Sequence, residues 1–68
     1  MILRVRVNGE DREVRDGITV GALLTELGLR RDGIAVAINL QVVPRGEHDQ
    51  RVLIEGDKIE VLQAVGGG

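Results

Sequence analysis

Three consecutive glycines, Gly66, Gly67 and Gly68, follow the last apolar residue of the sequence, Val65. Glycine has no Cβ, so a Gly-Gly segment lies extended in a tunnel that is too narrow for other residues. The reactive group would be the α-carboxylate of Gly68, which is anionic at neutral pH and therefore a poor electrophile. It needs activation, most simply by attack on the α-phosphate of ATP to give an acyl-adenylate. The alternative interpretation is an incidental tail, because chain termini tolerate change.

The rest of the sequence lacks the residues that such an activation needs. It contains neither G-x-x-x-x-G-K-[ST] nor G-x-G-x-x-G, the glycine-rich loops that hold phosphates. It has no cysteine to serve as a thiol nucleophile, and its one histidine, His48, does not build a metal site without several carboxylates. We therefore expect no bound cofactor. A separate enzyme would use the ATP, and this chain would be the substrate whose terminal carboxylate is activated, a reaction called charging below.

Composition and net charge limit the number of domains and the kinds of partner that this protein can have. The chain has 68 residues, enough for one small domain, and a formal net charge of −2 with both signs mixed along it. It has no Phe, Trp or Tyr on which bases could stack and no basic stretch, so we expect no nucleic-acid partner. No long apolar run precedes the first alternating segment. We therefore expect no signal peptide, no membrane span and a cytoplasmic location.

The N-terminal residues predict a β-hairpin. Apolar residues alternate with arginines over residues 3–7, the two-residue period of a strand with one wet face. Asn8-Gly9 follows, which is the strongest short signal for a tight hairpin turn because both residues tolerate positive φ. A second strand is expected over residues 12–15, ending at Asp16-Gly17.

A short amphipathic helix is predicted next. Thr19 is the expected N-cap, and Gly28 is the expected C-terminal glycine in a left-handed conformation. The apolar residues between them recur at i, i+3, i+4 and i+7, which gives one apolar face: Val20, Leu23, Leu24 and Leu27. A helix of this length does not persist alone in water, so it must pack on a sheet.

The second half of the chain predicts three more strands, over residues 34–38, 42–43 and 59–63, with Pro44 ending the second of them. We expect a turn at 39–41, an irregular segment with a single helical turn over 45–50, a short extended piece over 51–54 and a tight turn at 55–57. The order predicts an α+β fold, in which one helix covers one face of a mixed sheet of about five strands. This is the β-grasp, or ubiquitin-like, fold. We expect a β-grasp domain over residues 1–65 and a flexible glycine tail over residues 66–68.

Four short motifs, in this order, resemble those of the ThiS family of sulfur carriers. The hairpin segment Val7-Asn8-Gly9 fits that family, and residues 35–39 followed by 42–45 are similar to its stretch V-A-x-N-x-x-x-V-P-R. Residues 56–61 are similar to its G-D-x-I-E turn and strand, and residues 63–68 to its A-V-x-G-G ending. Each motif is weak alone, but together they cover essentially the whole chain. Glycine at position 66 departs from the family, in which many members have a larger residue.

The resemblance implies a role in making the thiazole ring of thiamin. A ThiF-type adenylating enzyme would activate the carboxylate of Gly68 with ATP. Sulfur delivered by way of a cysteine desulfurase would convert it to a thiocarboxylate. A ThiG-type thiazole synthase would then take the sulfur, and Gly66 and Gly67 would be needed for recognition of the tail. The chain would be a protein co-substrate and not an enzyme.

Other residues have structural or recognition interpretations. We expect Asn39 to be a turn residue, Asp57 to serve its own turn, and His48 to lie in a hydrated loop between Glu47 and Asp49. A partner surface is predicted on the exposed face of the sheet, where the last strand leads into the glycines. Its residues are Leu62, Gln63, Ala64 and Val65.

Three alternative functions stay open at the level of sequence. A MoaD-like carrier for molybdopterin synthesis has the same fold and the same Gly-Gly end. A carrier for another sulfur pathway, or a ubiquitin-like modifier joined to lysines, would use the same activated carboxylate. A non-covalent β-grasp interaction module would not need the tail at all.

Overall fold

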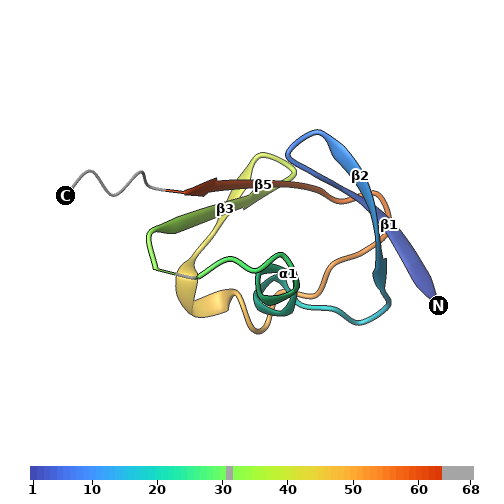
Figure 1. Cartoon of the computed structure of the whole chain (residues 1–68), viewed down its shortest axis with the longest axis horizontal. Coiled ribbons are helices and arrows are strands. Elements are labelled where there is room, and N and C mark those ends of the chain that lie inside the picture. Colours follow the sequence, from blue (N-terminus) through green and yellow to red (C-terminus); the bar gives the residue numbers. More distant parts are fainter. Residues whose placement is uncertain (31, 64–68) are drawn as a thin grey trace.

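The computed structural model describes residues 1–30 and 32–63, and it confirms the predicted α+β fold. Five strands form one mixed sheet in the order β2-β1-β5-β3-β4, in which β5 lies at the centre (Figure 1). The β1–β5 pair is parallel and the other pairs are antiparallel. The elements are β1 (Ile2–Val7), β2 (Glu10–Arg15), α1 (Val20–Glu26), β3 (Ile34–Ile38), β4 (Gln41–Val43), the short 3-10 helix η1 (Arg45–Glu47) and β5 (Lys58–Gln63).

The first hairpin forms as its sequence predicts. Asn8 and Gly9 have φ angles of 50° and 84°, the left-handed conformation that a two-residue hairpin turn requires. The register pairs Leu3 with Val14, so the apolar residues of both strands lie on the same side of the sheet. Arg4 and Arg6, which alternate with the apolar residues of β1, are exposed on the opposite side.

The helix α1 is closed at both ends by the predicted residues. The Thr19 hydroxyl oxygen accepts a hydrogen bond of 3.1 Å from the Ala22 amide. Gly28 has a φ of 74°, and the Leu29 amide donates to the Leu24 carbonyl at 3.0 Å, so the chain turns back onto the helix.

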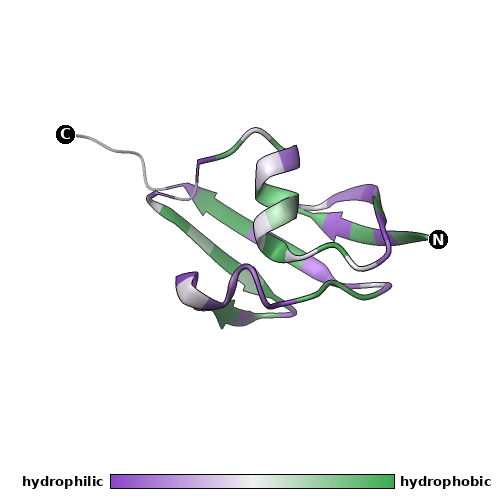
Figure 2. Ribbon diagram, turned by 90° about the horizontal axis from the view of Figure 1, so that it is seen from below, coloured by the Kyte–Doolittle hydropathy of each residue, from purple (hydrophilic) through white to green (hydrophobic). Residues whose placement is uncertain are grey.

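A single aliphatic core lies between α1 and one face of the sheet. Figures 1 and 2 show α1 against this face. The core is formed by Val5, Val7, Val14, Ile18, Val20, Leu23, Leu24, Val36, Ile38, Val43, Leu53, Ile59 and Val61. The opposite face, here called the outer face, carries no helix among the described residues. The described residues contain no helix of the length and hydropathy that a membrane span requires.

The turn between β3 and β4 is shorter than predicted. Asn39 and Leu40 alone make the reversal, with φ angles of 51° and 71°, and Gln41 already pairs with Ile38 in the sheet. Gln41 therefore belongs to β4 and not to the turn, because a two-residue turn with positive φ at both positions matches the twist of the strands it joins. The extended piece predicted over 51–54 is reduced to one bridge, between Val52 and Thr19.

The prediction of a hydrated His48 is wrong. Its side chain is only 1% exposed, and Nε2 lies 3.2 Å from the Val43 carbonyl oxygen, which accepts a hydrogen bond from it. The His48 carbonyl in turn accepts a hydrogen bond of 2.8 Å from the Gly21 amide at the start of α1. The acidic neighbours in sequence suggested hydration, but the ring is buried and lies against the Val43 carbonyl at the end of β4.

Candidate functional site

The predicted reactive residues Gly66, Gly67 and Gly68 lie outside the described residues, as do Ala64 and Val65. The structure places the strand that leads to them. Of the predicted partner surface, Leu62 and Gln63 are both exposed at the end of β5. Because β5 is the central strand, it has a neighbouring strand on each side. Further side-chain contacts fix its start and its end, and these contacts position the site.

The start of β5 is held by a buried network around Asp57, whose side chain is 2% exposed. One carboxylate oxygen accepts from the Asn39 side-chain amide at 3.0 Å, and the other accepts from the Ile54 amide at 2.9 Å. The Asn39 side-chain oxygen accepts from the Lys58 amide at 3.1 Å. Arg51 lies 3.8 Å from the same carboxylate. Asp57 therefore joins the turn before β5 to the β3–β4 turn, a wider role than the predicted service to its own turn.

The end of β5 is held by Asn8 from the first hairpin. Its side-chain oxygen accepts from the Val61 amide at 2.8 Å, and its side-chain nitrogen donates to the Val61 carbonyl at 3.3 Å. The two residues are separated by 53 positions in the chain. Sequence reasoning treated Asn8 only as a turn residue. The sequence indicates only that Asn8, as part of Asn-Gly, adopts a positive φ. A positive φ does not predict the contact with Val61.

The outer face of the sheet carries an apolar patch beside the end of β5. In a sheet, paired residues on neighbouring strands point to the same side. Leu62 pairs with Ala35, and Ala37 pairs with Val42, so these four side chains share the face opposite the core. Leu62 is 68% exposed and Val42 is 75% exposed. We call Leu62, Ala35, Ala37 and Val42 the outer-face patch.

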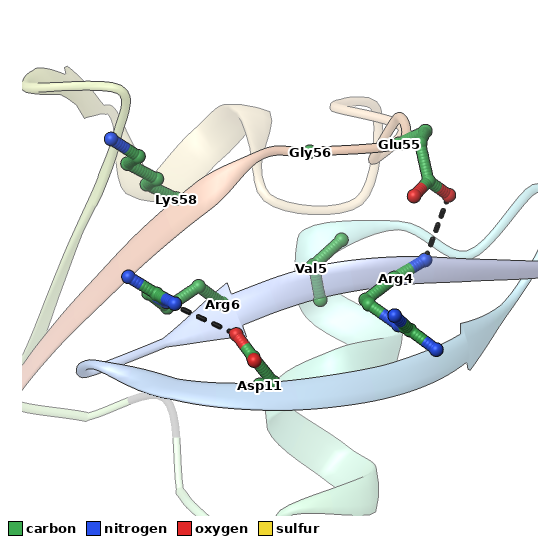
Figure 3. Close-up of a pocket in the computed structure, with 7 residues that line it drawn as sticks. All are labelled: Arg4, Val5, Arg6, Asp11, Glu55, Gly56 and Lys58. Atoms are coloured by element: carbon green, nitrogen blue, oxygen red, sulfur yellow. Dashed lines mark hydrogen bonds and ion pairs between the residues drawn. The ribbon is translucent and has the colours of Figure 1, made fainter.

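A hollow of roughly 300 Å³ lies on the same face of the sheet, beside the start of β5, and is lined by three basic and two acidic side chains (Figure 3). Arg6 and Lys58 are register partners there, and Arg4 lies two residues before Arg6 on β1. Arg6 forms an ion pair of 3.1 Å with Asp11 across the hairpin, whereas Lys58 has no ion-pair partner within residues 1–30 and 32–63. The exposed Arg6–Asp11 pair contributes little to stability. Glu60 lies between Lys58 and Leu62 on the same side of β5, so an approaching surface meets charges of both signs beside the apolar side chains.

The hollow is no candidate metal centre, since the described residues include no group of three or more side chains that could hold a metal ion.

One helix on a five-stranded mixed sheet, with the central strand leading toward the glycines, defines a small β-grasp, ubiquitin-like protein. The family model described as the ThiS family matches residues 5–68, and the chain belongs to this family.

Known proteins similar to this chain include carriers of the same size. The sulfur carrier protein ThiS of Escherichia coli is 36% identical over 66 residues, which cover 97% of this chain and 100% of that protein. The crystal structure of a thiamine biosynthesis protein (ThiS) from Geobacter metallireducens superimposes with a TM-score of 0.82 at 29% identity, covering 97% of this chain and 100% of that one.

Longer relatives also match. A protein named thiazole synthase from Paramagnetospirillum magneticum is 39% identical over 66 residues, which cover 97% of this chain and 20% of that protein. The chain thus spans about a fifth of the length of the thiazole synthases it matches.

Proposed function

We propose that this protein is a sulfur carrier for the thiazole ring of thiamin, and that Gly68 bears the sulfur. The observation that carries this proposal is the family match, which runs through to Gly68, the residue that would react. Curated carriers of the same size support it, because the similarity to the Escherichia coli protein extends over that whole protein.

The proposed chemistry takes place on the terminal carboxylate. A carboxylate oxygen of Gly68 attacks the α-phosphorus of ATP in a ThiF-type adenylating enzyme, and pyrophosphate leaves. Hydrosulfide then attacks the acyl-adenylate, AMP leaves, and the product is a thiocarboxylate. Where a cysteine desulfurase supplies the sulfur as a persulfide, the terminal sulfur attacks and AMP leaves from an acyl disulfide; a thiol then cleaves this S–S bond, releasing the thiocarboxylate and becoming part of a disulfide itself. The similarity to proteins named thiazole synthase supports a ThiG-type synthase as the acceptor of the sulfur.

In this proposal the chain acts as a co-substrate in the cytoplasm and binds no cofactor of its own. The domain over residues 1–65 supplies recognition, and the tail over residues 66–68 supplies the reacting group. Gly66 and Gly67 give the adenylating enzyme a tail without side chains.

The adenylating enzyme would dock on the predicted partner surface, Leu62 to Val65, and on the rest of the outer-face patch, to which Leu62 belongs whereas Gln63 points to the other side of the sheet. Two observations support this position. The patch lies on and beside the strand that leads to Gly68, and its two large residues, Leu62 and Val42, are exposed although they are apolar. Lys58, four residues before Leu62 on the same side of β5, has no ion-pair partner among the described residues and favours a carboxylate on the partner at this position.

Leu62→Asp is expected to lower kcat/KM for charging by the adenylating enzyme at least tenfold, since a charge at the centre of an apolar contact must be desolvated without a partner. Ile2→Asp is the matched control. Ile2 is 66% exposed against 68% for Leu62, but it lies at the opposite end of the sheet. Equal charging of both variants in a steady-state assay would contradict docking at the patch.

The rival of the same chemical type is a MoaD-like carrier for molybdopterin. Growth of an Escherichia coli strain that lacks its own ThiS separates the two. We expect this chain to restore growth without added thiamin and to leave a strain that lacks MoaD unrescued. Rescue of only the strain that lacks MoaD would contradict the thiamin role and indicate a role in molybdopterin synthesis.

A further inference from the structure

Asn8 ends the parallel ladder between β1 and β5 in an unusual way. The Arg6 amide donates to the Asp57 carbonyl, and the Asn8 amide donates to the Ile59 carbonyl, each at 2.9 Å. If this ladder continued, the Val61 amide would donate to the main-chain carbonyl of residue 8, and the Val61 carbonyl would accept from the amide of residue 10. The chain has already reversed into β2 at this point. The side-chain amide of Asn8 makes both bonds instead.

This pair of hydrogen bonds is the last that β5 makes on its β1 side within residues 1–30 and 32–63. In a strand, the backbone groups of alternate residues point to the same neighbour, so the amide and carbonyl of Gln63 point to the same side as those of Val61. No described residue bonds to them from that side. Gln63 lies opposite Ile34 in the register, but because its amide and carbonyl point away from β3, the last residue of β5 whose backbone groups face β3 is Leu62.

From this geometry we infer that Asn8 is a positioning residue for the C-terminal segment. Its side chain fixes β5 as far as Val61, and with it the position and direction of the strand from which the C-terminal segment continues. The inference rests on the proposed function, because a fixed end of β5 is an advantage when the residues that follow it in the sequence have to enter the active site of another enzyme. Without Asn8 the enzyme must itself order the end of β5, which weakens binding.

The test compares Asn8→Gly with Asn39→Gly. Both residues have a positive φ, 50° and 51°, that glycine adopts without strain, so the turns are kept. Each substitution removes two side-chain hydrogen bonds, and one bond from each residue is made to a backbone amide of β5. Asn8 holds the end of the strand and Asn39 holds its start. Circular dichroism at the assay temperature verifies that both variants are folded.

We expect two differences between these variants. Hydrogen exchange at the Val61 amide becomes roughly tenfold faster in Asn8→Gly than in Asn39→Gly, because the amide loses its acceptor. KM for charging by a ThiF-type enzyme with ATP and sulfide rises roughly three- to tenfold in Asn8→Gly alone, with kcat unchanged, since the bound enzyme supplies the missing order.

An unchanged exchange rate at Val61 in Asn8→Gly, or the same rise in KM in both variants, would overturn the inference and leave Asn8 with a general structural role. If the wild-type chain itself is not charged, the proposed function fails and the positioning role fails with it. The exchange rate of Val61 then still decides whether Asn8 holds the end of β5.

Discussion

A chain that ends at Gly66 is expected to lose charging completely and to unfold at the same temperature as the full chain. Its carboxylate stops two residues early, about 7 Å short of the position that the adenylating enzyme needs. Stability is preserved because every buried core residue of the described structure lies at or before Val61. The rate of charging by a ThiF-type enzyme and the thermal unfolding curve measure the two effects.

Gly67→Ala is the matched control for this deletion, because it keeps the length of the tail and adds only one methyl group. We expect it to be charged, but more slowly than the wild type, since the Cβ must fit a passage made for glycine. Partner binding and growth rescue by the chain that ends at Gly66 would contradict the carrier function. That result would favour the interaction module with an incidental tail.

Asp57→Ala is expected to have the largest effect on folding, about 3 kcal/mol in the free energy of unfolding. The substitution leaves the Ile54 amide and the Asn39 side-chain amide without acceptors, and it removes the carboxylate beside Arg51. A loss of this size is a large part of the stability of so small a domain. Chemical denaturation followed by circular dichroism measures it.

Glu55→Ala is the control for Asp57→Ala, because Glu55 lies in the same turn but is exposed. Its carboxylate accepts one bond, of 2.9 Å, from the Arg4 amide at the surface, so the expected loss is under about 1 kcal/mol. Asp57→Asn should fall between the two, because it keeps an acceptor for Ile54 but presents an amide nitrogen to the side chain of Asn39. Similar stability of all three variants would show that the Asp57 network does not hold β5.

The fold was predictable because local signals agree with the tertiary structure. Asn8-Gly9 requires the left-handed turn that the hairpin uses, and Thr19 and Gly28 mark the two ends of a helix whose apolar face is continuous. The start of β4 at Gln41 was missed, because the sequence Asn39-Leu40 does not indicate a two-residue turn. A leucine seldom adopts a positive φ such as the 71° of Leu40.

The contacts that hold β5 were not predictable from local patterns. Asn8 and Val61 are 53 residues apart, and Asn39 and Asp57 are 18 residues apart, so neither pair shows a periodicity. The burial of His48 depends on how the loop after β4 packs beneath α1. The exposure of Leu62 followed from its place in the alternation of β5. Its role in docking stays a prediction, as does the chemistry of Gly68.

The central claim is that Gly68 carries sulfur as a thiocarboxylate. The most direct measurement is the intact mass of the full chain after incubation with a ThiF-type enzyme, ATP and sulfide, followed by mapping of the C-terminal fragment. The mapping is needed because oxidation of Met1 changes the mass by nearly the same amount as the replacement of one oxygen by sulfur. We predict a sulfur-for-oxygen replacement located at Gly68. An unmodified C-terminal fragment, obtained with an enzyme that charges another ThiS protein in the same assay, would contradict the claim.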